Sequence, residues 1–433
     1  MRDGDTIVAL SSGAPPSGVA VIRLSGPKVA DLVRRATGSL PTPRRLTLLP
    51  IGDGAEIFDR GLVAYFPAPG SFTGEDCAEL QVHGSPAVVR AILRNLAAQP
   101  NVRLAEAGEF TRRAFEHGKL DLTAVEGLGD LIEAETESQR RQAFSRLSGG
   151  LSDRIESWRE TLLELRAEIE ARLDFSDEGD VADGLPESFA SALEGLEREI
   201  AEALESVSRG RIVREGVRIA LAGPPNAGKS SLLNALARSD VAIVTDEAGT
   251  TRDVREVAID LGGQLAILID MAGIRAADSK AEAEGVRRAL REIEAADLVL
   301  WLTAPDVADE QRPATPSRLW QIGTKCDLGA VGDAMFSLSS KTGSGMAAFI
   351  AALRDFARGL AGEGGPALLS RERDRVALEG ALAALRDAQR PGEASEITAD
   401  ALRRASHALE RLLGRIDAEA VLDRLFSAFC IGK

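Results

Sequence analysis

The sequence contains little cysteine and no long apolar run. Its three cysteines, Cys77, Cys326 and Cys430, are odd in number and show no C-x-x-C spacing, so neither a disulfide framework nor a zinc knuckle is predicted. Such sparse cysteine usage is typical of a reducing compartment. Residues 1–5 carry acids where a signal peptide has basic and then apolar residues, and no apolar run reaches membrane-spanning length. We therefore expect a cytoplasmic protein with no membrane partner.

Basic residues are also in deficit. Lysine and arginine number 52 against 67 aspartates and glutamates, which gives a formal net charge of -15 at pH 7. This balance argues against a broad basic surface for nucleic acid, although a local basic patch or a basic partner subunit could still hold RNA. With 433 residues the chain is too long for one ordinary core, and about two to four domains are expected.

Residues 223–230 read G-P-P-N-A-G-K-S, which fits the phosphate-binding P-loop pattern G-x-x-x-x-G-K-S. Apolar residues at 217, 219 and 221 predict a strand before this loop, and leucines at 232, 233 and 236 predict a helix after it. In that setting backbone N–H groups and the positive end of the helix face phosphate oxygens. Lys229 is expected to reach the β- and γ-phosphates of a nucleotide, and the Ser230 hydroxyl to bind Mg²⁺. The predicted phosphate contacts are Asn226, Ala227, Gly228, Lys229, Ser230 and Ser231.

Further nucleotide-binding signals follow in the order that a GTPase needs. Residues 249–253, G-T-T-R-D, lie where a switch threonine closes over the γ-phosphate; we assign Thr251 to Mg²⁺, and Thr245 and Thr250 to the nucleotide. An apolar strand at 266–269 delivers Asp270 to the metal, and Gly273 ends a D-x-x-G motif whose backbone N–H can contact the γ-phosphate. Each motif is weak alone, but their order and spacing favour a GTPase.

The segment T-K-C-D at 324–327 predicts the base reader. A carboxylate at Asp327 can accept from the N1–H and the exocyclic amine of guanine, whereas adenine offers no such pair of donors. Thr324 and Lys325 complete this motif, and the next loop would support the base through Ser339, Ser340 and Lys341. GTP and GDP are therefore the expected ligands.

The group that orients the hydrolytic water is less clear from the residues. Many GTPases place a glutamine directly after D-x-x-G for this purpose, but here the position holds Ile274, which cannot hold a water. Glu282 lies downstream on the expected switch segment. On spacing alone, an exposed acid at a helix start is the better interpretation of Glu282.

The nucleotide-binding segment, residues 216–358, sits between two helical stretches. Residues 1–118 predict a mixed α/β unit, with strands near 6–10, 19–24, 62–66 and 79–83 and helices near 28–36 and 87–98. Residues 119–210 predict long helices, one with an apolar seam from Leu151 to Ile169, and helices resume at 366–433 after a glycine-rich linker. We therefore expect an α/β and all-α multidomain chain, with a P-loop domain inserted into a discontinuous helical domain. The apolar tail at 426–433 is expected to dock in a pocket.

Several segments resemble the MnmE (TrmE) family of tRNA-modification GTPases over essentially the whole chain. They are S-F-T-G-E-D at 71–76, G-E-F-T-R-R-A-F at 108–115 with G-K-L-D-L at 118–122, the P-loop, A-G-T-T-R-D at 248–253 and the terminal F-C-I-G-K at 429–433. The resemblance implies an N-terminal α+β domain that binds folate and forms a homodimer, a discontinuous helical domain, and an inserted Ras-like P-loop G domain.

The resemblance also implies a reaction. Family members work with an FAD-dependent partner, MnmG, in a heterotetramer that adds an aminomethyl or carboxymethylaminomethyl group to C5 of the wobble uridine (U34) of certain tRNAs. The one-carbon unit comes from 5-formyltetrahydrofolate or a related tetrahydrofolate. By their positions in this sequence, Arg23, Glu79, Lys119 and Lys433 match family residues that contact folate. Cations suit the carboxylates of folate, and a glutamate can accept from the N–H donors of the pterin.

Potassium ions are implied for the hydrolysis step. In the family, two G domains meet across K⁺, and the ion takes the place of an arginine finger. The implied ligands here are the Asn226 side chain and the backbone carbonyls of Thr245, Glu247 and Thr250. Glu282 matches the family residue that positions the hydrolytic water, so the resemblance makes Glu282 the expected catalytic residue.

Three positions depart from the family pattern. Met271 stands where D-T-A-G has threonine; because Asp270 and Gly273 remain, nucleotide binding is expected to survive, and the question falls on the hydrolysis rate. Thr324 replaces the asparagine of N-K-x-D, which predicts loss of a side chain that braces the loop and weaker guanine affinity. Ala107 replaces a proline before residues 108–110, which is expected to change only the stiffness of the loop.

Two other functions stay open. A stand-alone regulatory or ribosome-assembly GTPase would share the nucleotide-binding motifs but would have no use for Arg23, Glu79 or the tail. A nucleotide-binding scaffold with weak turnover would fit Met271 and Thr324. Binding of 5-formyltetrahydrofolate speaks against the first alternative, and GTP hydrolysis against the second.

Overall fold

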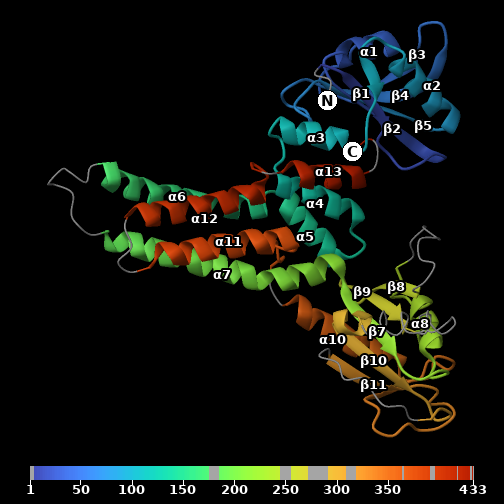
Figure 1. The fold of residues 1–433 in the computed structure, drawn as a ribbon. Coiled ribbons are helices and arrows are strands. Elements are labelled where there is room, and N and C mark those ends of the chain that lie inside the picture. The colour runs from blue at the N-terminus through green and yellow to red at the C-terminus, as the bar shows by residue number, and fades with distance from the viewer. Residues whose placement is uncertain are drawn as a thin grey trace, which may run out of the picture. The chain divides into compact units, whose positions relative to one another are not determined.

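The computed structural model describes residues 4–174, 185–243, 255–271, 291–308, 318–362, 365–390, 395–416, 418–429 and 432. The chain divides into two compact units (Figure 1), residues 1–129 with 409–433, and residues 130–408. Among the described helices, none is both long and apolar enough to cross a lipid bilayer. The domain limits expected from the sequence stay predictions.

The first unit is built on a six-stranded sheet with the order β3-β4-β5-β2-β1-β6. Neighbouring strands are antiparallel except β1 and β6, which are parallel. Buried apolar residues alternate with more exposed ones in the second half of β2, as a strand with two different faces requires. The strands are β1 (Thr6–Leu10), β2 (Ser17–Ser25), β3 (Thr47–Gly52), β4 (Ile57–Phe66), β5 (Cys77–Gly84) and β6 (Val102–Leu104).

The two faces of this sheet carry different helices. Helices α1 (Val29–Thr37) and α2 (Pro86–Ala97) cover one face, where their apolar sides share a buried core with Ile22 and Leu80. The opposite face carries α3 (Glu109–Glu116), which packs on Ile7 and Ala9 of β1 through Phe110. Successive strand residues point to opposite faces, so one strand serves both cores.

The C-terminal segment belongs to this first unit. Helix α13 (Glu419–Ala428) packs on α3, and its Phe426 is 1% exposed. Gly432 has a φ of 99°, and a Cβ atom on it would lie 2.1 Å from the Leu10 carbonyl oxygen. The Ser11 hydroxyl donates to the Gly432 carbonyl at 2.8 Å. The predicted docking of the tail is therefore confirmed at Gly432, a position that only glycine fits.

The second unit contains a bundle of long helices. Helices α6 (Gly150–Asp174) and α7 (Glu187–Glu215) precede the nucleotide-binding segment in the chain, and α11 (Glu372–Ala388) follows it. Helix α7 packs against both α6 and α11, as Figure 1 shows. The predicted seam on α6 is buried at all six positions: Leu151, Ile155, Trp158, Leu162, Leu165 and Ile169. The discontinuous helical domain is thus confirmed.

Three further helices complete the helical part. Helix α5 (Glu137–Leu147) lies within the second unit and packs against α6 and α7. Helices α4 (Leu122–Glu133) and α12 (Ser395–Leu413) each cross the limit between the two compact units.

Between α7 and α11 the chain forms a second six-stranded sheet with the order β12-β11-β10-β7-β9-β8. All neighbouring strands are parallel except β8 and β9. Helices α8 (Lys229–Ala237) and α10 (Met346–Ala361) contribute apolar residues to its main core. The inserted P-loop α/β domain of the prediction is therefore present. Its strands are β7 (Val217–Ala222), β8 (Arg255–Asp260), β9 (Leu265–Asp270), β10 (Leu298–Thr303), β11 (Arg318–Gly323) and β12 (Phe336–Ser337).

Candidate functional site

The predicted nucleotide-binding residues gather at one edge of the second sheet. Strands β7, β9, β10, β11 and β12 are parallel, so their carboxyl ends meet at the same edge. The P-loop follows β7, Asp270 ends β9, Thr324 follows β11, and Ser339 comes shortly after β12. Open α/β sheets bind ligands at this edge where the strand order reverses, and here it reverses at β7.

The P-loop makes a tight turn that depends on glycine. Gly223 has a φ of 140°, and a Cβ atom on it would lie 2.3 Å from the Leu302 carbonyl oxygen, so no other residue fits. The Lys229 ammonium donates to the carbonyls of Gly223 and Pro224, each at 2.8 Å, and the residue is 8% exposed. These bonds hold the cation at the loop that is predicted to receive phosphate.

Ser230 and Asp270 meet beside the P-loop. The Ser230 hydroxyl donates to Oδ2 of Asp270 at 2.7 Å, and Asp270 is 2% exposed. Both side chains offer hard oxygen atoms, which are the ligands that Mg²⁺ prefers. These two donors therefore fit the predicted Mg²⁺ site.

The base-reading residues line a pocket of about 240 Å³. A hydrogen bond from the Ser339 side chain lowers the pKa of the exposed Asp327 carboxyl. Asp327 is therefore ionised at neutral pH, the state that accepts both N–H groups of guanine. The lining residues are Gly228, Ser231, Thr324, Lys325, Asp327, Leu328, Ser339, Ser340 and Lys341. The pocket thus joins the end of the P-loop to the predicted base reader.

Thr324 holds the P-loop by a side-chain hydrogen bond, although the sequence predicted that threonine at this position would lose this contact. Its hydroxyl lies 2.6 Å from the Ala227 carbonyl oxygen and 3.0 Å from that of Thr303, so its single proton is shared between them. Thr324 is 3% exposed, and the loops that carry it and Ala227 approach closely enough for a short side chain to span them. The prediction that threonine removes the brace is therefore wrong.

Lys325 makes a contact that no motif indicated. Its φ is 52°, and its ammonium pairs with both carboxylate oxygens of Asp306, at 2.7 and 2.9 Å. This hydrogen bond lowers the pKa of the exposed Asp306 carboxyl. Asp306 lies in the loop after β10, and only the pairing of β10 with β11 brings that loop beside Lys325. The ion pair sets the direction of a side chain that lines the pocket.

Met271 occupies an apolar environment directly after β9. It is 7% exposed and packs with Ala222, Ile293 and Trp301. A methionine fills such a gap without a polar group, whereas a buried threonine hydroxyl needs a hydrogen-bond partner. The departure at position 271 is therefore consistent with its surroundings.

Part of the predicted site lies outside the described residues. This applies to Thr245, Glu247, Thr250, Thr251, Gly273, Glu282 and Lys433. Of the predicted K⁺ ligands Asn226 is described, and it is exposed on the P-loop with a φ of 63°. The roles assigned to these residues stay predictions.

Two of the predicted folate-binding residues face each other across strands of the first sheet. Arg23 on β2 lies in register with Glu79 on β5, and its guanidinium donates to Glu79 Oε1 through Nε at 3.2 Å and Nη2 at 2.9 Å. The guanidinium carbon also lies 5.7 Å from the centre of the Phe72 ring and 5.8 Å from that of Phe110. Phe110 belongs to α3, so the pair lies on the sheet face that α3 covers.

Lys119 and the docked tail lie close to the same strands and loops. A Cβ atom on Gly74 would lie 3.3 Å from Cε of Lys119, which places Lys119 beside the loop that carries Phe72. Gly432, the residue before Lys433, contacts β1 at Leu10, next to the position paired with Arg23. The first unit therefore brings Gly432, the residue before Lys433, close to the strands and loops that carry Arg23, Glu79 and Lys119.

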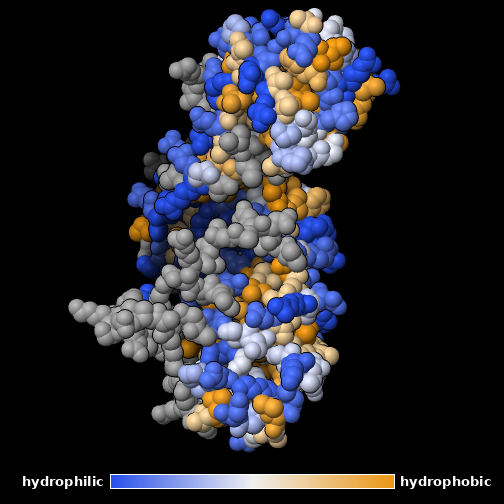
Figure 2. Space-filling model, turned by 90° about the vertical axis from the view of Figure 1, so that its right-hand side faces the viewer, coloured by the Kyte–Doolittle hydropathy of each residue, from blue (hydrophilic) through white to orange (hydrophobic). Residues whose placement is uncertain are grey.

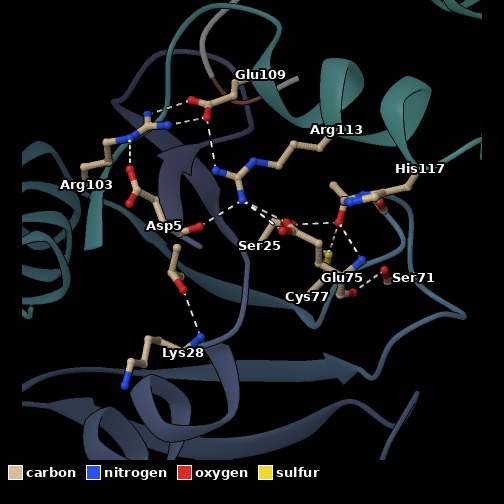
Figure 3. A network of polar contacts seen from close by, with 12 residues as sticks. Asp5, Ser25, Lys28, Ser71, Glu75, Cys77, Arg103, Glu109, Arg113 and His117 are labelled. Carbon is tan, nitrogen blue, oxygen red and sulfur yellow. Dashed lines mark hydrogen bonds and ion pairs between the residues drawn. The ribbon is translucent and has the colours of Figure 1, made fainter. Parts of the chain in front are cut away.

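A buried ion-pair network holds the loop at 71–76 against α3 (Figure 3). Glu109, whose side chain is 4% exposed, accepts from Arg103 at 2.6 Å and from Arg113 at 3.1 Å. Arg113 also donates to Glu75 at 2.9 Å, and the Ser25 hydroxyl donates to the same carboxylate at 2.6 Å. The network links the motifs at 71–76 and 108–115. No sequence pattern indicated that these two motifs form ion pairs with each other. It fixes the two segments that place Phe72 and Phe110 beside Arg23.

The charge state of Glu109 follows from this network. Burial alone would raise the pKa of its carboxyl, but hydrogen bonds from Arg103 and from the backbone N–H of Glu106 outweigh burial and lower it. Glu109 is therefore ionised at neutral pH and neutralises the two arginines that enclose it.

These features define the class of protein. A P-loop on a mostly parallel sheet, joined in one pocket to the acidic residue predicted to read guanine and inserted into a helical bundle, is typical of a multidomain P-loop GTP-binding protein. A family profile described as MnmE helical domain matches residues 122–430, and one described as GTP-binding protein TrmE N-terminus matches residues 6–119. The chain belongs to the MnmE family of tRNA modification GTPases.

Individual relatives agree with this assignment over their full length. A protein of Rhodopseudomonas palustris named tRNA modification GTPase MnmE is 48% identical over 438 residues, which cover 99% of each chain. Proteins with the same name from Azorhizobium caulinodans and Rhizobium meliloti are 48% and 49% identical over 437 and 441 residues, 100% of each chain.

Proposed function

We propose that this chain is a K⁺-stimulated GTPase that modifies tRNA together with an FAD-dependent partner, MnmG. In this proposal the two proteins add an aminomethyl or carboxymethylaminomethyl group at C5 of the wobble uridine (U34) of certain tRNAs. The observation that carries the proposal is the pocket in which the P-loop meets Asp327, in a chain whose full-length relatives are named tRNA modification GTPases. A homodimer, a heterotetramer with MnmG and a cytoplasmic location belong to the same proposal.

The proposed nucleotide site assigns a task to each group at the sheet edge. Lys229 exchanges its loop carbonyls for the β- and γ-phosphate oxygens of GTP, because its ammonium already lies over the loop. Asp327 selects guanine through its ionised carboxylate. Ser230, with Thr251, holds Mg²⁺, which when bound neutralises phosphate charge.

The proposed folate site uses the Arg23–Glu79 pair. Arg23 supplies a cation for a folate carboxylate, and Glu79 keeps acceptor capacity for pterin N–H groups because both hydrogen bonds from Arg23 go to its Oε1 atom. Phe72 is 40% exposed beside Arg23 and offers a flat apolar surface to a ring. Lys119 and Lys433 would add positive charge for the tetrahydrofolate.

For hydrolysis we propose that Glu282 positions the attacking water and that K⁺ binds Asn226 with the carbonyls of Thr245, Glu247 and Thr250. Ile274 cannot orient a water, so a group other than the residue after D-x-x-G is needed.

The decisive experiment compares GTP hydrolysis by the full-length chain in KCl and in NaCl at equal ionic strength. We expect faster turnover in KCl. Equal rates in the two salts contradict the role of K⁺, and no turnover in either salt contradicts the enzyme and favours the scaffold. Binding of 5-formyltetrahydrofolate is tested separately by calorimetry on the wild type and on Glu79→Ala. Failure of the wild type to bind favours the stand-alone GTPase.

A further inference from the structure

Two stretches of the first unit contain no acidic residue. Aspartate and glutamate supply 67 of the 433 residues of the chain, yet neither occurs at 32–52 or at 80–105. The arginines in these stretches are Arg34, Arg35, Arg44, Arg45, Arg90, Arg94 and Arg103. The local charge is thus opposite in sign to the net charge of -15 of the whole chain.

The fold places the helices of these two stretches on one side of the first sheet, and Arg45 lies in the loop between α1 and β3. The first stretch includes most of α1, and the second includes all of α2. Both helices share a buried core on the same sheet face, so their exposed sides form the outer surface of one layer. The Arg23–Glu79 pair lies on the opposite face, beside α3. Hydrophilic residues make up much of the surface of the first unit in the view of Figure 2 (upper part).

Four of these arginines are exposed, and their guanidinium groups make no hydrogen bond or ion pair with any described residue: Arg35, Arg45, Arg90 and Arg94. The other three have partners; for example, Arg34 pairs with Asp31 at 3.1 Å. Arg404 of α12, by contrast, pairs with both Asp387 and Asp400. Arg90 and Arg94 lie one helical turn apart, so their side chains project in the same direction.

The exposed sides of α1 and α2 lack the features of a protein-binding surface. Neither helix exposes a large apolar side chain, whereas Leu46 and Leu48, which follow Arg45, are exposed. Protein interfaces are centred on apolar and aromatic anchors, whereas phosphate backbones are bound by separate cations with polar side chains between them. Thr42, Asn95 and Gln99 are polar side chains of this kind within the two stretches.

We infer that Arg35, Arg45, Arg90 and Arg94, here called the arginine face, bind the phosphate backbone of the tRNA substrate. The inference rests on the proposed function, which supplies tRNA as the partner. Guanidinium groups match phosphate oxygens with two parallel hydrogen bonds. Contacts of this type depend on backbone shape and not on base sequence, so the arginine face would hold different tRNAs in one orientation. It would do so on the sheet face opposite the predicted folate site.

The test measures binding of an unmodified tRNA transcript with U34 to the full-length chain by fluorescence anisotropy at several KCl concentrations. One double variant is Arg90→Glu with Arg94→Glu, and a second is Arg35→Glu with Arg45→Glu. The matched control is Arg60→Glu with Arg358→Glu, which makes the same charge change at exposed sites on β4 and α10. Each test variant is expected to raise Kd at least about tenfold at ~0.1 M salt and to reduce the slope of log K against log salt by about one to two. The control is expected to stay within about threefold of wild type.

The outcomes separate this inference from the proposed function. GTP hydrolysis and 5-formyltetrahydrofolate binding should be unchanged in both test variants, because their residues touch neither site. If either test variant binds tRNA like the control, the arginine face is wrong and the proposed function stands. If the wild type binds no tRNA while it hydrolyses GTP, both the arginine face and the tRNA part of the proposed function are wrong. Should a glutamate variant fold poorly, Arg90→Gln with Arg94→Gln replaces it, and tRNA affinity equal to wild type overturns the inference.

Discussion

Replacing Thr324 by valine removes one hydroxyl and almost nothing else, so it isolates the brace between the base-reading loop and the P-loop. The hydroxyl lies 2.6 Å from the Ala227 carbonyl oxygen, and Thr324 is 3% exposed, so water cannot easily take its place. The Thr303 carbonyl keeps its bond from the Thr324 backbone N–H at 2.8 Å. The loss therefore falls on Ala227, whose carbonyl is left without this donor.

Leaving a buried acceptor unsatisfied costs about 1–3 kcal/mol. If the nucleotide-bound P-loop carries this whole cost, Thr324→Val weakens GTP binding roughly 5- to 150-fold, since 1.4 kcal/mol corresponds to a factor of ten. Thr324→Ser keeps the hydroxyl and should stay within about threefold of wild type. Titration with a fluorescent GTP analogue measures both variants. Equal affinity of the valine and serine variants would refute the role of the brace.

Three other predictions concern single carboxylates. Asp306→Asn releases Lys325 and should weaken GDP binding by at most about fivefold, because partly exposed ion pairs contribute about 0.2–1 kcal/mol; stronger binding by the variant in the same titration would contradict a positioning role. Glu109→Gln removes the carboxylate that Arg103 and Arg113 share, but Arg103 keeps Asp5 and Arg113 keeps Glu75, so it should lower the free energy of unfolding in urea by about 1–3 kcal/mol. The exposed control Glu137→Gln should change it little. Folding lowers the pKa of Glu109, so the contribution of this carboxylate to the free energy of unfolding is fully present above its ordinary pKa of 4.5. The contribution is lost as the pH falls through the lower pKa of the folded state. The difference in stability between wild type and Glu109→Gln should therefore shrink in acid. Glu282→Ala should keep GTP binding and slow hydrolysis by ~10² or more; unchanged turnover removes Glu282 from the mechanism.

Much of the fold could be predicted because its apolar periodicity is strong. The buried seam of α6 and the strands β1, β2, β4 and β5 all lie where the sequence pattern placed them. Two strands of the first sheet were not predicted. β3 is an edge strand that contains Pro50 and exposes Leu48, and β6 has three residues, so neither shows a clear alternation. Edge pairing of this kind is decided by the neighbouring strand and not by the segment itself.

The candidate site divides in the same way. The positions of Lys229, Ser230 and Asp327 at one edge of the sheet could be predicted because each proposed task demands one residue type at one spacing in the chain. Asp306 could not, since it reaches Lys325 only through the pairing of β10 with β11. The ion-pair network around Glu109 is equally remote from local pattern, because it joins β6, α3 and the loop at 71–76. At Thr324 the motif rule was wrong: it predicted that threonine could not brace the P-loop. The two loops lie close enough for the Thr324 hydroxyl to reach the Ala227 carbonyl oxygen.

Coupling of GTP hydrolysis to uridine modification is the central step of the proposed function. Nucleoside mass spectrometry of a tRNA with U34 tests it directly, after incubation with this chain, MnmG, a tetrahydrofolate one-carbon donor, and either GTP or a non-hydrolysable GTP analogue in KCl. The account predicts modified uridine with GTP and little with the analogue. Equal yields in the two reactions, or GTP hydrolysis without any modified uridine, would contradict it.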